Sequence, residues 1–330
     1  MKYIDTLIEK AKLNRKTIVL PEANDIRTLK AAEIIYNKDF ADIILIGNEE
    51  KILNLAKSNN IIINSRIIDP DKFEDTNKLI EYFYELRKEK GMTKDEAKSI
   101  ITTNYLYFGC MLVKMGYADG QVSGATHSTS DTLRPALQIL KTDKESPIAS
   151  SFFLMDTHDT SIGENGLFIY SDCGMIQSPT KEELVEIAKS SEKTFRLLIN
   201  DNPRIAFLSH STLGSSKCDD AYKVVDAVKL TKEKYPELLV DGELQFDAAV
   251  IPSVAKSKAP NSKVAGKANI LIFPDLDAEN IAYKITERIG HTDAYGPVMQ
   301  GLAKPVNDLS RGCKAEDIVG VVAITSLQAK

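Results

Sequence analysis

Two hydroxyl-rich turns, each next to an arginine, hold the residues best suited to chemistry. The first, SGATHSTSDTLRPALQ (123–138), offers Gly124 for a tight turn and the hydroxyl groups of Ser128 and Thr129. A helix is predicted to begin here, and the free main-chain N–H groups at a helix N-terminus bind anions. Arg134 follows within the first turns, and its forked guanidinium suits phosphate. The alternative is an ordinary helix cap, but we favour an anion site because turn and arginine indicate the same ligand.

The second turn, LSRGCKAED (309–317), precedes the last predicted helix. It would bring the Ser310 hydroxyl and the Arg311 guanidinium beside the Asp317 carboxylate at a helix N-terminus. The chain has nine arginines against 33 lysines, so an arginine in such a turn is informative. The stretch that begins at Gly296 and leads to this turn consists almost entirely of loop-forming residues. On spacing alone an alternative is equally good, with Asp317 as a first-turn charge and Ser310 as a cap.

Three further residues are candidates to which the local sequence pattern assigns no definite role. Arg87 and Arg288 lie close to predicted helix ends where a glycine follows. Taken singly, each is best explained as a cation that complements the helix dipole. His127 could be a catalytic base, although a single histidine in a turn is more often a structural hydrogen-bonding residue.

Several common catalytic motifs are missing. No G-x-G-x-x-G follows a predicted strand, and NSKVAGKAN (261–269) lacks the first glycine and the Ser/Thr of a P-loop. There is no G-x-S-x-G, and the four histidines are dispersed, without the spacing of a zinc site. These absences argue against a serine hydrolase, a zinc enzyme and a standard dinucleotide site.

Composition indicates a soluble, cytoplasmic protein. The net charge of -5 and the pI of about 5.6 argue against a nucleic-acid partner. No apolar run reaches the roughly 18–20 residues of a membrane span, and residues 1–17 are predicted as an amphipathic helix rather than a signal peptide. The four scattered cysteines are expected to be reduced thiols rather than disulfides or metal ligands.

Strands and helices alternate along the chain, which predicts mainly parallel, doubly wound α/β sheets. A domain boundary is expected around KTDKESPIASS (141–151). The apolar last helix must pack on a domain, but the sequence alone does not choose which. The predicted strands are 17–22, 41–48, 118–124, 204–212 and 269–275; the predicted helices are 1–17, 25–37 (with Asp25 as N-cap), 77–91, 104–116, 220–235, 278–290 and 314–330.

A series of motifs resembles the phosphate acetyltransferase (phosphotransacetylase) family. The motifs keep their order from about Leu20 to the C-terminus and so cover nearly the whole chain. The sequence departs from the family around SDCGMIQSPT, where many members have Asn-Pro in place of Ile176 and Gln177. The matching stretches are LPEANDIR, RKEKGMT, SGATHSTSDTLRPALQ, SSFFLM, DGELQFDAA, VAGKANILIFPDL, GPVMQGLAKPVNDLSRG and EDIVGVVAITSLQA.

The resemblance implies reversible transfer of acetyl between coenzyme A and inorganic phosphate, through acetyl phosphate. It assigns Asp317 as the base that takes the thiol proton and Ser310 as the hydroxyl that stabilises the transition state. Arg311 corresponds to a substrate-binding arginine. No activated nucleophile is apparent, which fits direct thiolate attack in a ternary complex.

The resemblance also assigns Arg87, Arg134 and Arg288 to binding coenzyme A or phosphate, and we expect the Ser128–Thr129 turn to hold phosphate. It implies two α/β domains with an interdomain cleft, like isocitrate and isopropylmalate dehydrogenases, with the active site in the cleft. The first domain would comprise residues 1–146 and 302–330, since the C-terminal segment returns to it, and the second 147–301. A homodimer is implied, with no metal and no permanently bound cofactor.

Three alternatives stay open. A phosphate butyryltransferase would use the same chemistry with a larger acyl pocket. A hydroxy-acid dehydrogenase could use the same two-domain architecture. A catalytically silent acyl-CoA-binding regulator is disfavoured by the intact set of Ser310, Arg311 and Asp317.

Overall fold

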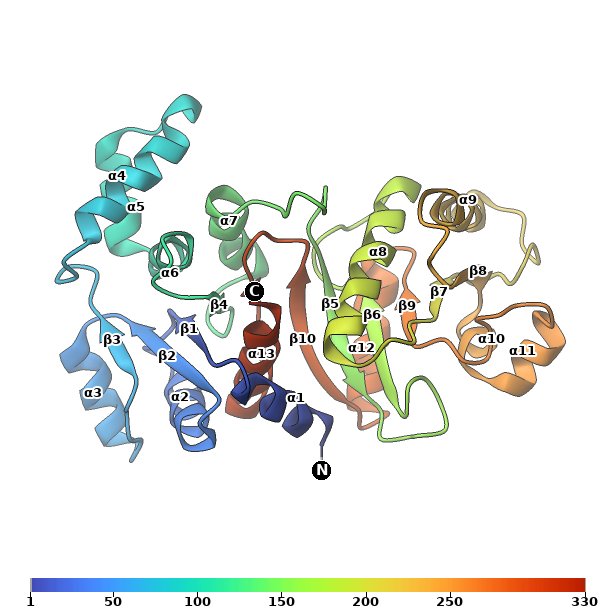
Figure 1. Cartoon of the computed structure of the whole chain (residues 1–330), viewed down its shortest axis with the longest axis horizontal. Coiled ribbons are helices and arrows are strands. Elements are labelled where there is room, and N and C mark those ends of the chain that lie inside the picture. Colours follow the sequence, from blue (N-terminus) through green and yellow to red (C-terminus); the bar gives the residue numbers. More distant parts are fainter. Residues whose placement is uncertain (1, 330) are drawn as a thin grey trace. The chain divides into compact units, whose positions relative to one another are not determined.

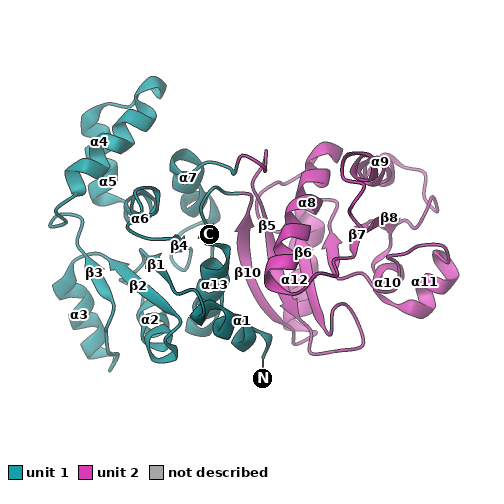
Figure 2. Ribbon diagram, viewed as in Figure 1, with its two compact units in different colours: residues 1–143, 302–330 teal, residues 144–301 magenta. Residues whose placement is uncertain are grey.

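The computed structural model describes residues 2–329 and divides the chain into two compact units (Figure 2). The first unit contains the chain up to Asp143 and again from Leu302, and the second runs from Lys144 to Gly301. Each unit is built on its own β-sheet (Figure 1). The predicted α/β fold class with mainly parallel sheets is confirmed.

The sheet of the first unit has the strand order β11-β4-β1-β2-β3, and all of its neighbouring strands are parallel. Figure 1 shows α2, α3 and α13 on one side of this sheet and α6 and α7 on the other. Helices on both faces explain why the strands are apolar runs rather than alternating ones. The strands are β1 (Lys16–Leu20), β2 (Ala41–Ile46), β3 (Arg66–Ile68), β4 (Gly120–Val122) and β11 (Val306–Asn307).

The predicted helices 25–37, 77–91 and 104–116 lie close to observed helices of the first unit. The predicted helix 1–17 is too long, because the described helix ends at Lys12 and β1 begins at Lys16; residue 1 lies outside the described residues. The predicted N-cap is confirmed, since the Asp25 side chain accepts a hydrogen bond from the Arg27 N–H. The apolar last helix packs against α1, α2 and β4. The helices are α1 (Tyr3–Lys12), α2 (Ile26–Lys38), α3 (Glu49–Ser58), α4 (Thr76–Arg87), the 3₁₀ turn η1 (Lys88–Lys90), α5 (Lys94–Thr103), α6 (Tyr105–Lys114), α7 (Thr129–Ile139) and α13 (Ala315–Gln328).

Three loops of the first unit leave the sheet at one edge. Val19 on β1 is in register with Gln121 on β4, and Val122 is in register with Asn307 on β11. Because these strands are parallel, their carboxyl ends meet at the same edge, where ligands of open α/β sheets bind. The residues that follow β1, β4 and β11 are therefore close neighbours.

The sheet of the second unit has the order β10-β5-β6-β9-β7-β8, with β10–β5 and β5–β6 antiparallel and the other pairs parallel. Its strands are β5 (Ser150–Asp156), β6 (Leu167–Ser171), β7 (Ile205–Leu208), β8 (Val240–Leu244), β9 (Ile270–Ile272) and β10 (Asp293–Gln300). Its helices are α8 (Lys181–Leu198), α9 (Asp219–Lys234), α10 (Phe246–Val250), α11 (Pro252–Lys258) and α12 (Leu276–Arg288).

The loop expected from Gly296 onward is partly wrong, because residues 296–300 belong to β10. Val298 and Met299 are buried and pair with β5. Pro297 falls where the register shifts between Tyr295 and Val298, a position at which a missing N–H is tolerated. Pairing and burial thus outweigh the loop-forming composition.

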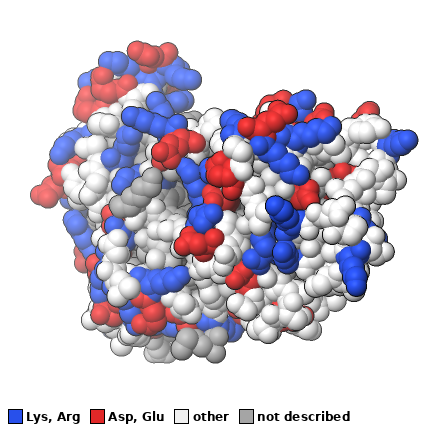
Figure 3. All heavy atoms as spheres, turned by 45° about the vertical axis from the view of Figure 1, so that its right-hand side comes forward, with Lys and Arg blue, Asp and Glu red and all other residues white. Residues whose placement is uncertain are grey.

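One face of the molecule carries charges of both signs. The face drawn in Figure 3 shows Lys and Arg side chains interspersed with Asp and Glu side chains. Among the described residues, no helix is both long and apolar enough to cross a membrane.

Candidate active site

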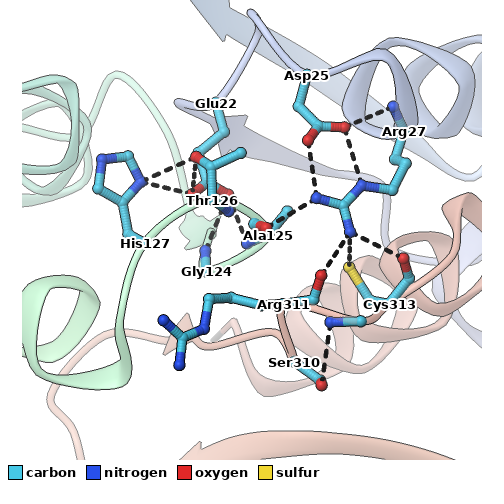
Figure 4. Close-up of polar contacts among 11 residues, drawn as sticks. Glu22, Asp25, Arg27, Gly124, Ala125, Thr126, His127, Ser310, Arg311 and Cys313 are labelled. Carbon is cyan, nitrogen blue, oxygen red and sulfur yellow. Dashed lines mark hydrogen bonds and ion pairs between the residues drawn. The ribbon is translucent and has the colours of Figure 1, made fainter.

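The turn after β4 surrounds an internal carboxylate, that of Glu22 (Figure 4). The N–H groups of Gly124 and Ala125 donate to Glu22 Oε2 at 2.9 and 2.8 Å, and the Thr126 N–H donates to Oε1 at 2.9 Å. The Thr126 hydroxyl and His127 Nδ1 also contact Oε1, at 2.8 and 2.6 Å. Glu22 is only 2% exposed. These main-chain N–H groups therefore bind the protein's own carboxylate and are not free for a ligand.

The start of α7 retains open donors. Ser128 is the N-cap, whose hydroxyl accepts from the Asp131 N–H and donates to the Asp131 carboxylate at 2.6 Å. The Thr129 hydroxyl donates to Asp308 Oδ2 at 2.6 Å. Within residues 2–329 no hydrogen-bond partner is found for the N–H groups of Thr129 and Ser130. These first-turn N–H groups, rather than the two hydroxyls, are the donors available to an anion.

Gly124 brings this turn into close contact with the end of β11. Its φ is +114°, and a Cβ atom there would lie 2.1 Å from Asp308 Oδ1 and 2.6 Å from the Leu309 nitrogen. Only glycine permits this approach. Asp308 is 1% exposed, and its burial raises the pKa of the carboxyl to about 6. The contact fixes the segment that leads directly to Ser310.

Arg27 ties the two turns together, a role that the sequence patterns did not reveal (Figure 4). Its guanidinium binds the Asp25 carboxylate through two nitrogens, at 3.0 and 2.8 Å. It also donates to the carbonyl oxygens of Ala125 and Arg311, both at 2.8 Å, and of Cys313 at 3.0 Å. One sequence signal for this role was available: Arg27 comes two residues after the predicted N-cap Asp25, in the segment that follows a predicted strand. At such a position one guanidinium can bind two loops at once.

The second predicted turn lies just before α13. The Ser310 hydroxyl is exposed and accepts a 3.4 Å hydrogen bond from the Gly312 N–H. Lys314 is the N-cap of α13, so the alternative that made Ser310 a cap is wrong. Asp317 Oδ2 accepts the Lys314 N–H at 2.7 Å, as a first-turn carboxylate does. Among the described residues its other oxygen has no hydrogen bond, which leaves a face of the carboxylate for a ligand.

Two more predicted arginines approach Tyr107 of α6. Burial raises the pKa of Tyr107, and the positive charges of Arg134 and Arg87 act in the opposite direction. Arg87, at the end of α4, has a buried Nε for which the described part of the chain supplies no partner. Arg134 is exposed on α7. Arg288 ends α12 in the second unit, 3.5 Å from the Glu287 carboxylate, and its role stays a prediction.

The pattern of ion pairs separates the arginines into two groups. Five of them contact carboxylates: Arg15, Arg27, Arg196, Arg204 and Arg288. The other four, Arg66, Arg87, Arg134 and Arg311, form no ion pair with any carboxylate in the region that the structure describes. Every arginine of the first unit that the sequence assigned to substrate is in this second group. An unpaired guanidinium is available to bind an external anion.

A possible metal-binding group, Asp156, His158 and Asp293, lies in the second unit. His158 Nδ1 is 3.2 Å from Asp156, and its Nε2 is 3.5 Å from Asp293. The carboxylates thus approach opposite nitrogens of the ring. One ligand atom from each of the three residues lies within 4.8 Å of the others, while the two carboxylates contact different ring nitrogens, as hydrogen-bonding partners of a histidine do.

Comparison with known proteins identifies the family. The sequence model described as phosphate acetyl/butaryl transferase matches residues 2–326. The chain belongs to this family. The resemblance predicted from the motifs is confirmed, and so is the assignment to the acyltransferases.

Individual relatives agree along the full length. The chain is 52% identical to phosphate acetyltransferase of Acetivibrio thermocellus, over 100% of this chain and 99% of the relative. A phosphotransacetylase structure from Streptococcus pyogenes is 44% identical with a TM-score of 0.91, covering 99% of this chain and 98% of that one. The structure of 4-hydroxythreonine-4-phosphate dehydrogenase from Klebsiella pneumoniae is 12% identical, with a TM-score of 0.56 over 96% and 100% of the two chains. That last similarity concerns the fold alone.

Proposed function

We propose that the protein is a phosphate acetyltransferase that moves acetyl reversibly between coenzyme A and inorganic phosphate. The observation that carries this proposal is the Arg311 guanidinium, which forms no ion pair among the described residues and lies on a loop that Arg27 holds beside the start of α7. Full-length similarity to proteins named phosphate acetyltransferase supports acetyl as the transferred group. Three relatives that are 47–52% identical over the full length of this chain are named phosphate acetyltransferase, so the butyryltransferase alternative is not favoured.

The thiol of coenzyme A attacks the carbonyl carbon of acetyl phosphate in a ternary complex. At neutral pH most of a thiol with a pKa of about 8.5 is protonated, so attack requires a base. Asp317 takes this proton through the oxygen that the Lys314 N–H leaves open. Ser310 donates a hydrogen bond to the developing oxyanion, an interaction whose loss costs about 3 kcal/mol in comparable enzymes.

The phosphate group is held at the start of α7. The first-turn N–H groups of Thr129 and Ser130 supply donors, and Arg311 and Arg134 supply positive charge. The Ser128 and Thr129 hydroxyls act indirectly, because they cap the helix and bind Asp308. Growing negative charge on the leaving phosphate is neutralised by the two guanidinium groups.

Direct transfer also agrees with the state of the nearby thiol. Cys313 lies in the same loop, but burial raises the pKa of its thiol to about 11. A nucleophilic cysteine requires the opposite shift. Cys313 therefore serves packing, and its main-chain oxygen serves as an acceptor for Arg27.

The remaining predictions belong to the same proposal. Arg87 and Arg288 bind coenzyme A. The protein works as a cytoplasmic homodimer in acetate metabolism. We expect no permanently bound cofactor or metal, because acetyl-CoA, acetyl phosphate and phosphate already carry the reacting groups.

The test measures release of free thiol when the protein is mixed with acetyl-CoA and phosphate, with butyryl-CoA in parallel. Phosphate-dependent release that is faster from acetyl-CoA supports the proposal. Faster release from butyryl-CoA would make the protein a butyryltransferase. Release of thiol from neither substrate would contradict the proposed transferase function.

Two variants test the assigned roles. Asp317→Asn should lower kcat by about 100-fold or more with little change in KM, whereas its exposed neighbour variant Glu316→Gln should not. Arg311→Lys keeps the charge but loses the fork, so kcat/KM should fall by about tenfold or more. An unchanged Arg311→Lys enzyme would show that Arg311 does not bind phosphate through two nitrogens.

A further inference from the structure

The proposed reaction moves two protons, and the residues assigned so far account for one of them. When the thiolate attacks acetyl phosphate, the C–S bond forms, the C–O bond breaks and its electron pair stays on the phosphate oxygen. The acetyl phosphate dianion would then release PO₄³⁻, a far poorer leaving group than HPO₄²⁻. A second group must protonate the leaving phosphate, and must deprotonate HPO₄²⁻ when it attacks acetyl-CoA.

His127 has the geometry for this second transfer. Its Nδ1 lies 2.6 Å from Glu22 Oε1, and a carboxylate in this position accepts, so Nδ1 carries the hydrogen. The ring therefore presents Nε2 outward, and the side chain is 45% exposed. A buried carboxylate that fixes the tautomer and stabilises the imidazolium is how enzymes orient a histidine for proton transfer.

The position of His127 matches the proposed phosphate site. The residue immediately precedes Ser128, the N-cap of α7, and so stands at the open first turn of that helix. The preceding turn is joined to the Arg311 loop through Arg27. In the view of Figure 4 the imidazole and the Arg311 guanidinium extend to the same side of the turn.

The charged groups around the imidazole are consistent with a proton carrier. Glu22 faces it from the end of β1, and the buried Asp308 lies close enough to feel the charge of Glu22. Asp131, in the first turn of α7, has its pKa lowered chiefly by the Ser128 hydroxyl, and also by the charges of Arg134 and His127. A carboxylate from each of two elements, the end of β1 and the first turn of α7, therefore acts on the imidazole.

We propose that His127 is the general acid–base on the phosphate group, and that Glu22 is its positioning residue. This inference rests on the proposed transferase function. In the direction of acetyl-CoA, imidazolium Nε2 gives its proton to the departing phosphate while Asp317 accepts the thiol proton. In the reverse direction neutral Nε2 takes the proton of HPO₄²⁻ and Asp317 returns one to the thiolate. The net transfer is one proton from thiol to phosphate, or back.

The primary experiment compares wild type, His127→Gln, His127→Ala and the control His210→Gln. His210 is an exposed histidine whose Nε2 lies 3.1 Å from the Ser216 hydroxyl, and it has no part in the proposed site. We expect His127→Gln to lower kcat about 100-fold with a small change in KM, and His210→Gln to stay within about threefold of wild type. Added imidazole should restore part of kcat to His127→Ala, and one limb of the pH profile of kcat should disappear in both His127 variants.

Glu22 is tested with Glu22→Gln, which keeps the shape of the side chain. As a positioning residue it should lower kcat more than it changes KM, and in a His127→Gln background it should cause no further loss of kcat. Additive losses of kcat in the double variant would make Glu22 merely structural.

The outcomes separate the two proposals. Wild-type protein without phosphate-dependent thiol release would remove the function and the inference together. Active wild type with His127→Gln within about threefold of it would overturn the inference alone. A low kcat in His127→Ala with no rescue by imidazole and an unchanged pH profile would also overturn it, and would leave the transferase standing.

Discussion

Glu22 in the first unit and Glu279 in the second are both buried, but their surroundings are opposite. Glu22 is 2% exposed and is contacted by three main-chain N–H groups, a hydroxyl and an imidazole. Glu279 is 0% exposed, and neither of its oxygens has a hydrogen-bond partner among the described residues. Burial, together with the charge of Asp172, raises the pKa of Glu279 to about 9. Donors favour the charged form of a carboxyl group, and their absence favours the neutral form.

The difference shows that burial alone does not mark a functional carboxylate. Glu22 follows β1 at the sheet edge where three loops meet, so main-chain donors converge on it. Glu279 lies in the first turn of α12, where a carboxylate would normally complement the helix dipole at the surface. Packing against the sheet buries it instead, beside Tyr283 and Tyr170. The surroundings of Asp308 are intermediate between those of Glu22 and Glu279. One carboxylate oxygen accepts a hydrogen bond from Thr129, and the other has no partner among residues 2–329.

The largest expected effect concerns Glu279 and pH. Between about pH 4.5 and 9 the folded state holds the proton and the unfolded state does not, so this group lowers the free energy of unfolding by about 1.4 kcal/mol per pH unit. Glu279→Gln removes that slope, and the variant should gain up to about 4 kcal/mol over wild type from pH 5 to pH 8. Urea denaturation followed by circular dichroism measures this. The control is Asp277→Asn, which changes an exposed residue of the same helix. If the free energy of unfolding varied with pH in the same way in Glu279→Gln and wild type, the Glu279 carboxyl would not be neutral in the folded protein.

Removing the hydrogen-bonded carboxylate of Glu22 should have the next largest effect on stability. Glu22→Ala leaves three main-chain N–H groups without their acceptor, which should lower the free energy of unfolding by about 3 kcal/mol. The same denaturation at pH 7 measures the loss. Glu9→Ala removes an exposed carboxylate paired with Lys12 and should cost less than about 0.5 kcal/mol. Equal losses in the two variants would mean that the Glu22 network contributes nothing beyond a surface pair.

Asp308 tests the intermediate case. Its raised pKa, about 6, means that its contribution to stability is present at low pH and is lost as the pH rises from about 4 to 6. Asp308→Asn should therefore gain about 2 kcal/mol relative to wild type between pH 4 and pH 7. Asp71→Asn, an exposed aspartate of the same unit, should show no such gain. The interpretation fails if the Asp308 and Asp71 variants behave alike.

The smallest expected effect concerns the residue that joins the two turns. Arg27→Lys keeps the charge beside Asp25 but loses carbonyl contacts to Ala125, Arg311 and Cys313, so we expect a loss of about 1–2 kcal/mol. Arg15→Lys, at an exposed pair with Asp39 and Asp42, should cost less than about 1 kcal/mol. Denaturation at pH 7 compares them, and a larger loss at Arg15 would contradict the bridging role.

The sequence by itself determined the α/β class, most of the helices and strands named from their patterns, and the cap at Asp25. These features depend on residues within a few positions of one another, through apolar periodicity and helix-end chemistry. The ordered motifs also determined the family. They singled out Arg87, Arg134 and Arg311, which carry no carboxylate partner in the described chain.

Tertiary structure alone decided how the candidate site is held. The Gly124–Thr126 turn binds Glu22, which lies 102 to 104 residues earlier, and Arg27 reaches Arg311 across 284 residues. It also decided that residues 296–300 form a strand, because pairing with β5 supplies what local composition does not. The sequence around an acidic residue or an arginine looks the same whether the side chain binds water or distant main-chain groups. Only the folded arrangement of parallel strands brings those partners to one edge of the sheet.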